Sequence, residues 1–153
     1  MNTTTLGARR NGREHGQSLV EASFIFLMFV FLFIGVLDVG FYSYALISVQ
    51  SAARVAAVYT STNKFSAGDS VGACAVVLKE LSALPNITGN AVTTCGALPL
   101  LVSAVGPTPD ANIPTIYYST VTVQYQTIFL IPIPGILTNQ LTVTRIVQLA
   151  VLS

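Results

Sequence analysis

The N-terminal part of the chain contains its longest run of apolar residues. Ala22–Leu37 carries no charge, and the longer stretch Leu19–Val39 contains only two charged residues, Glu21 and Asp38. A helix over the longer stretch rises roughly 31 Å, about the thickness of the hydrocarbon core of a bilayer. The run shows no polar face, unlike a core helix, and exceeds the apolar part of a signal peptide, about 7–15 residues. The pattern therefore predicts a membrane-spanning helix.

Apolar positions continue beyond this run with helical periodicity. They recur at intervals of three and four residues, at Val39, Tyr42, Leu46, Val49, Ala53 and Ala56. No proline interrupts residues 17–59, and a turn-like cluster follows at residues 60–63. We expect one helix of about 40 residues whose second half is a spine for the following domain. The spine is rich in small residues, which allow close approach of another element, either the chain's own domain or other chains.

The remainder of the chain has the pattern of a small α+β domain. Asp69 and Ser70 can cap a short helix over Val71–Leu84. Strict alternation predicts strands over Ser119–Thr127 and Leu141–Leu149, although Arg145 and Ile146 break the alternation in the second. These two strands predict a C-terminal antiparallel hairpin. Shorter strands are possible near residues 92–95 and 100–105, and residues 106–114 are typical of a loop.

An apolar segment, Ile128–Leu137, connects the two strands of the hairpin. Prolines at positions 132 and 134 argue against a continuing ladder there. The segment can fold back on the core, touch the membrane or dock on a partner. The predicted organisation is thus a basic leader (1–16), a transmembrane helix with its extension (17–60) and an exported α+β domain (61–153).

Composition excludes several classes of function. Charged residues make up 8% of the chain, against about 25% in typical soluble domains. The formal net charge of +1 provides no basic surface for a nucleic acid. The one histidine, His15, precedes the membrane helix, so no histidine-dependent catalytic site is expected beyond it. We expect no metal, no cofactor, no small-molecule substrate and no enzyme activity.

The charges that flank the apolar run predict its orientation. Arg9, Arg10 and Arg13 precede the run, and the first basic residue after it is Arg54. Positive charge stays on the cytoplasmic side, so the N-terminus is expected inside and the rest of the chain outside. Cys74 and Cys95 then lie in an oxidising compartment, where they either form a disulfide or remain two unpaired buried thiols.

The residues at the start of the apolar run resemble the class III signal of type IV pilin-like proteins. A basic segment ends in Gly16, and Glu21 lies five residues further on, at the head of the apolar helix. The resemblance implies that a prepilin peptidase cuts between Gly16 and Gln17 on the cytoplasmic face. A carboxylate entering hydrocarbon is costly, so Glu21 needs a reason to be there. The ammonium that cleavage creates at Gln17, on the same or a neighbouring chain, can pair with the Glu21 carboxylate. The other interpretation is that the Glu21 side chain extends to the membrane–water interface and has no structural role.

A longer pattern is similar to the TadE-like proteins, pilin-like components of the tight-adherence (Tad or Flp) pilus system. The pattern is the Gly16–Glu21 motif, the apolar run, the Gly35–Gly40 segment around Asp38, and the small-residue segment Gln50–Ala57. The resemblance extends from Arg13 to about Tyr59. The chain departs from the family in having Ala22 where an aromatic residue is usual, and in lacking a proline within the apolar run.

The resemblance implies a minor pilin or pseudopilin in the bacterial inner membrane, acting in pilus assembly and adhesion by helix packing. The implied partners are the membrane, a prepilin peptidase, other pilin-like subunits and the inner-membrane Tad assembly platform. Glu21 would set helix pairing and register, and Asp38 would mark the outer membrane boundary. Contacts between subunits would use Ala45, Ala52, Arg54 and Ala56; the alternatives are that the alanines pack only on the chain's own domain and that Arg54 is simply solvated. The rival hypothesis is a signal-anchored periplasmic domain that binds a ligand or senses the state of the envelope without joining a fibre.

Overall fold

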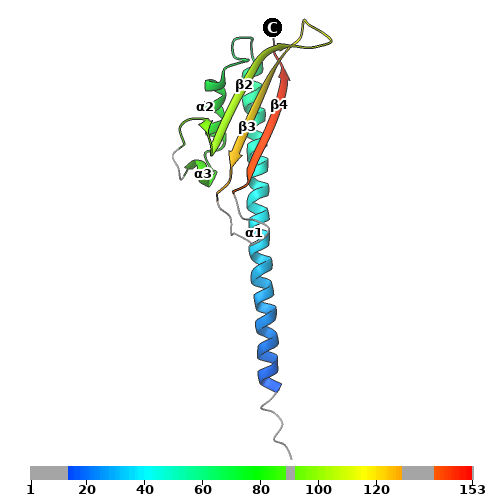
Figure 1. The fold of residues 1–153 in the computed structure, drawn as a ribbon, viewed down its shortest axis with the longest axis vertical. Coiled ribbons are helices and arrows are strands. Elements are labelled where there is room, and N and C mark those ends of the chain that lie inside the picture. Colours follow the sequence, from blue (N-terminus) through cyan, green and yellow to red (C-terminus); the bar gives the residue numbers. More distant parts are fainter. Residues whose placement is uncertain (1–13, 89–91, 129–139, 153) are drawn as a thin grey trace, which may run out of the picture. The chain divides into compact units, whose positions relative to one another are not determined.

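A computed structural model describes residues 14–88, 92–128 and 140–152 of the chain (Figure 1). Within these residues, three helices come first, a long α1 (Glu14–Ser61), then α2 (Ser70–Glu80) and a single turn, α3 (Pro85–Thr88). The described part of the chain then forms four strands, β1 (Gly96–Ala97), β2 (Leu100–Pro109), β3 (Tyr117–Gln126) and β4 (Thr142–Ala150). The predicted α+β class, with a long N-terminal helix and a small antiparallel domain, is confirmed.

The chain divides into two compact units, of which the first ends at Val39 and the second is Gly40–Ser153. In the first unit, the described residues belong to α1, and their large apolar side chains are exposed. Phe24 and Phe26, for example, are each 71% exposed. Within the described residues, α1 is the one helix long and apolar enough to cross a membrane. Its first part therefore has a surface suited to lipid rather than to water.

The second unit is built on an antiparallel sheet in the order β1-β2-β3-β4, with α1 and α2 beside it (Figure 1). Alternate residues of β3 are buried, from Ser119 through Val121 and Val123 to Tyr125, as the alternation predicts. In β4, Val143 is buried, whereas Ile146 is 66% exposed on the opposite face. Arg145 shares the face of Val143 and is partly buried, which explains the break in the sequence alternation.

The core of the second unit consists of small residues from α1 and larger ones from α2 and the sheet. One face of α1 is entirely buried, at Ala45, Val49, Ala52, Ala53, Ala56 and Ala57. These side chains form one hydrophobic cluster with buried residues of α2 and the sheet. Ser119 of β3 fixes the end of α1, since its Oγ lies 2.8 Å from both Thr60 Oγ1 and the Ala67 carbonyl oxygen.

The structure differs from the sequence expectations at several boundaries. The predicted helix over 71–84 ends at Glu80, and α3 follows as a separate turn. Residues 92–94 form no strand, and β1 begins at Gly96 instead. The predicted loop over 106–114 was partly wrong, because β2 continues to Pro109 after a register shift between Val105 and Thr108. Proline is tolerated there because bulges and unpaired strand edges need no ladder N–H. Most of the apolar Ile128–Leu137 segment lies outside the described residues.

Candidate assembly interface

The described residues of the predicted class III signal lie in the first turns of α1. Gly16, Gln17 and Glu21 are all exposed, and Gln17 and Glu21 are one helical turn apart. Residues four apart lie on the same helix face, so the Glu21 carboxylate and the backbone nitrogen of Gln17 are on one side of α1. Among the described residues, no side chain approaches the position of a Cβ at Gly16 within 4 Å.

Asp38 is the other charged residue of the apolar run. Its exposed fraction is only 7%, and within the described part of the chain its Oδ2 atom is buried and has no hydrogen-bond partner. A carboxylate oxygen in this state is costly, because burial removes its water without supplying a donor. The sequence marks Asp38 as an exception within an apolar helix, but it does not indicate burial.

The alanines that the sequence assigned to contacts between subunits lie inside the chain's own core. Ala45, Ala52 and Ala56 are each 0% exposed and belong to the hydrophobic cluster of the second unit. Only Arg54 of that predicted set is on the surface. The alanine face packs against the chain's own domain, so a neighbouring chain would have to use another face of α1.

The opposite face of α1 carries a line of exposed residues, which we call the outer stripe. Its residues follow one another at helical spacings of three and four, and they are Tyr44, Ile47, Ser51, Val55 and Val58. Ile47 is 70% and Val58 is 60% exposed, and the stripe contains no charged residue. The periodicity that predicts the buried face does not reveal the stripe. The signal for the stripe is the set of apolar residues that lie between the buried positions in the sequence.

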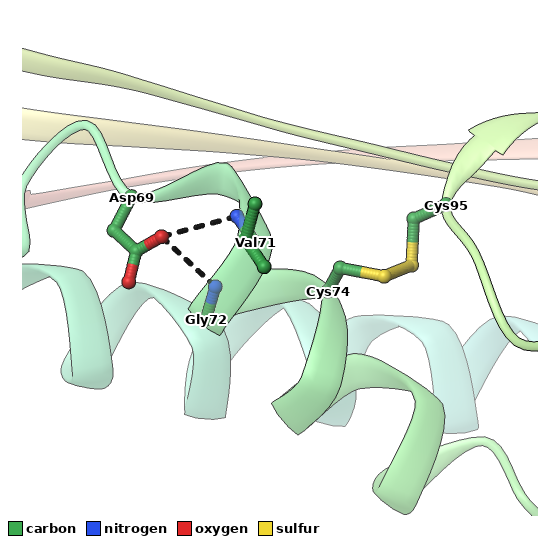
Figure 2. The surroundings of a disulfide bond; sticks show 5 residues. All are labelled: Asp69, Val71, Gly72, Cys74 and Cys95. Carbon is green, nitrogen blue, oxygen red and sulfur yellow. Dashed lines mark hydrogen bonds between the residues drawn. A yellow bond between two sulfur atoms is a disulfide. The ribbon is translucent and has the colours of Figure 1, made fainter.

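A disulfide joins Cys74 of α2 to Cys95, the residue before β1 (Figure 2). The predicted disulfide is therefore present, and it closes a loop across a sequence separation of 21. That loop contains the rest of α2 after Cys74 and the whole of α3. Cross-linking such a segment restricts the unfolded chain more than the folded one, and so it favours folding.

Asp69 caps α2 as the sequence predicts. Its Oδ1 atom accepts hydrogen bonds from the backbone N–H groups of Val71 at 3.1 Å and Gly72 at 2.9 Å (Figure 2). The Tyr59 hydroxyl donates to its Oδ2 atom at 2.8 Å, which links the cap to α1. The hydrogen bond from Gly72, then that from Tyr59, lower the pKa of the Asp69 carboxyl below its usual value.

The Asp69→Asn variant is expected to lose stability at neutral pH but not in acid. Asparagine keeps a capping oxygen but does not ionise. Because the folded-state pKa of Asp69 is lowered, its ionised form stabilises the fold above the unfolded pKa of about 3.9. That contribution disappears as the pH falls through the folded-state pKa. Urea unfolding of both chains at about pH 7 and pH 2 tests this, and an equal difference at both pH values would contradict it.

Among the described residues, the histidine, cysteine, aspartate and glutamate side chains form no group of three or more that could hold a metal ion. The features that stand out are instead an apolar helix, an uncharged exposed stripe on its continuation, and a small domain tied together by a disulfide.

A comparison with protein-family models gives a match within the apolar helix and its continuation, α1. Residues 16–58 are TadE-like. The family resemblance inferred from the sequence is thus confirmed over this segment, and it indicates a pilin-like protein associated with a Tad pilus. No curated protein and no solved structure matches the chain.

The TadE-like segment comprises most of α1, including the signal residues, Asp38 and the outer stripe. The disulfide, the Asp69 cap and the sheet all lie beyond it. Pilus components of the TadE-like family are structural proteins rather than enzymes. Together with the one apolar helix, the match suggests a single-pass membrane protein of a pilus system.

Proposed function

We propose that this chain is a minor pilin or pseudopilin of a Tad (Flp) pilus that acts in pilus assembly and adhesion through lateral packing of α1. The observation that carries the proposal is the outer stripe. A large apolar residue on a water-facing helix is unfavourable, and burying an isoleucine or valine side chain contributes about 1.5–3 kcal/mol. A line of such residues without charges is the kind of exposed apolar surface that marks an interaction site.

The outer stripe fits another apolar helix because it combines large and small residues. Tyr44, Ile47 and Val55 provide apolar contact area, and Ser51 lies between them as a small residue. Because residues 16–58 of this chain are TadE-like, we propose that the partner helix belongs to another pilin-like chain. Arg54 lies beside the stripe on the exposed surface and is available for a polar contact at its border.

Glu21 is proposed to set pairing and register within the membrane. A prepilin peptidase that cuts after Gly16 would leave an ammonium group at Gln17, one helical turn before Glu21. An ammonium of the same or a neighbouring chain would neutralise the carboxylate, which is costly to hold alone near hydrocarbon. A pair between two chains could form only where Glu21 of one chain and the ammonium of the other lie at the same depth in the membrane. Such a pair would therefore fix the relative axial position of the two helices.

The charges and the disulfide support the membrane placement in this proposal. The arginines at positions 9, 10 and 13 support a cytoplasmic N-terminus, and the Cys74–Cys95 disulfide is consistent with an oxidising periplasm. Asp38 would then lie at the outer boundary of the bacterial inner membrane. The proposed partners are a prepilin peptidase, other pilin-like subunits and the inner-membrane Tad assembly platform.

The mature N-terminus distinguishes this proposal from a signal-anchored periplasmic domain that binds a ligand or senses envelope state. Co-expressed with a prepilin peptidase, the chain is expected to begin at Gln17, as read by intact mass and N-terminal sequencing. A Gly16→Leu variant provides the control, because the side chain blocks cleavage without removing the membrane helix. A wild-type chain that still begins at Met1 would favour the signal-anchored alternative.

A further inference from the structure

Within the described part of the chain the sheet ends at β4, whose outer side pairs with no further strand (Figure 1). At one end of β4 the Thr127 N–H donates to the Leu141 carbonyl oxygen at 2.9 Å, and at the other the Val151 N–H donates to the Tyr117 carbonyl oxygen at 2.7 Å. In an antiparallel pair, such hydrogen-bonded residues alternate with residues whose N–H and C=O groups point away. The continuous register of β3 and β4 therefore places outward backbone groups at alternate residues, Thr142, Thr144, Ile146, Gln148 and Ala150. We call these groups the free edge of β4.

The opposite edge of the sheet is closed by the chain itself. There β1 pairs with the start of β2, and the Cys95 carbonyl oxygen accepts the Val102 N–H at 3.0 Å. The next outward N–H, that of Ala104, donates to Ser70 Oγ at 3.0 Å, and the same hydroxyl donates to the Ala104 carbonyl oxygen at 3.3 Å. A strand added at this edge would have to displace these partners, whereas the free edge of β4 offers its groups directly.

The free edge of β4 lacks most of the features that protect exposed strands. Edge strands are usually short, or they carry proline, lysine or a bulge. β4 has 9 residues, contains neither proline nor lysine, and pairs with β3 without a register shift. The residues that form the free edge are all exposed and uncharged, with Ile146 at 66%. These are the properties of a strand to which an extended peptide can add.

Arg145 is the one charged residue of β4, and it lacks a counter-ion among the described residues. Its Nη1 atom donates to the Thr144 carbonyl oxygen at 3.2 Å, an outward group, so the guanidinium lies at the free edge. Its Nε atom is buried and has no hydrogen-bond partner in the described part of the chain. A guanidinium that is partly withdrawn from water favours a carboxylate, which it can bind through two N–H groups.

We propose that the free edge of β4 binds an extended segment of another protein, and that a carboxylate of this segment pairs with Arg145. Backbone hydrogen bonds along the edge would provide affinity, and the ion pair would select an acidic partner. The binding surface belongs to the second unit, so the proposal depends neither on packing of α1 nor on entry into a pilus.

The acidic residues of the chain argue against a second copy as the occupant. The chain has 6 of them, and none lies in a described strand. Asp69 and Asp110 already accept hydrogen bonds from backbone N–H groups of their own chain. The others belong to helices, Glu14, Glu21 and Asp38 to α1 and Glu80 to α2. A second copy therefore has no extended segment that carries a free carboxylate.

Amide hydrogen exchange of the full chain in detergent micelles, followed by NMR, tests the geometry. The probe is a synthetic peptide as long as β4 that alternates valine and threonine and carries one central glutamate. Without the peptide, the amides of the free edge should exchange at least about tenfold faster than those of the intervening residues, and saturating peptide should abolish this difference. Free-edge amides that the peptide leaves unprotected would overturn the proposal. So would free-edge amides already protected without it, which would show that the chain or a second copy closes the edge.

Charge reversal tests the selection of an acidic partner. By fluorescence anisotropy, the chain should bind the labelled glutamate peptide at least about tenfold more tightly than a matched lysine peptide. The Arg145→Glu variant should reverse this preference. Equal affinities for the two peptides, or a preference that the variant does not change, would contradict the role of Arg145.

A proline variant tests the backbone contacts. Ile146→Pro removes an outward N–H but no hydrogen bond to β3, so the sheet should keep its circular dichroism while peptide affinity falls at least about tenfold. Ile146→Thr retains the N–H and is the matched control. Equal peptide binding by the two variants would overturn the proposal, and the charge reversal decides independently if the proline variant does not fold.

Discussion

The Ile47→Asp variant is expected to abolish pilus production while the second unit keeps its fold. Ile47 is a residue of the outer stripe and is 70% exposed, so an aspartate at this position is solvated in the isolated chain. Against an apolar helix of another subunit, the same carboxylate would be buried without a partner, at a cost of several kcal/mol. Piliation is counted by electron microscopy of cells that carry the variant as their only copy, with loss of at least about 90% expected.

The matched control is Gln50→Asp, which introduces the same charge one turn along α1. Gln50 is also exposed but lies beside the outer stripe rather than in it. This variant should retain piliation, because its carboxylate stays in water. Equal amounts of both chains in the membrane fraction show that insertion is intact. Equal piliation in the two variants would contradict the assignment of the stripe to subunit packing.

Removal of the disulfide is expected to lower the free energy of unfolding by about 3 kcal/mol. The paired variant Cys74→Ser and Cys95→Ser avoids leaving a single reactive thiol. The loop closed by the disulfide spans a sequence separation of 21, and in the chain-entropy account a loop of this size contributes about that amount. For a small domain this is a large part of the total stability.

Urea unfolding of the full chain in detergent micelles, followed by the circular dichroism of the sheet, measures this loss. Wild-type chain treated with a reducing agent should unfold at the same urea concentration as the paired variant. Gly96→Ala serves as the control, because a Cβ at Gly96 meets no atom within 4 Å. A loss below about 1 kcal/mol for the paired variant would show that the fold does not depend on the disulfide.

The regular elements of this fold could be predicted because each has a strong local pattern. The apolar run and the absence of proline define α1, and the alternation from Ser119 to Tyr125 defines β3. The Asp69 cap is equally local, since its acceptor serves N–H groups only two and three residues away. Periodicity and capping depend on neighbours in the sequence, so no tertiary information is required.

The functional surfaces could be predicted only in part, because burial is a tertiary property. The small residues at positions 45, 52 and 56 suit a partner helix and the chain's own domain equally well, and they are buried in the chain's own core. The free edge of β4 depends on the order of the strands in the sheet, which the alternation within a single strand does not reveal. The strand over Gly106–Pro109 could not be predicted because prolines usually end strands. In the structure β2 continues through these residues after a register shift between Val105 and Thr108.

Photo-cross-linking from the outer stripe tests most directly whether α1 lies beside other pilin-like helices. A photoreactive phenylalanine analogue replaces Tyr44, which is 50% exposed in the stripe, in cells that assemble the pilus. The account predicts covalent links from position 44 to the N-terminal helix of another pilin-like chain, and few links when the probe replaces Gln50. Links only to lipid, or equal links from both positions, would contradict it.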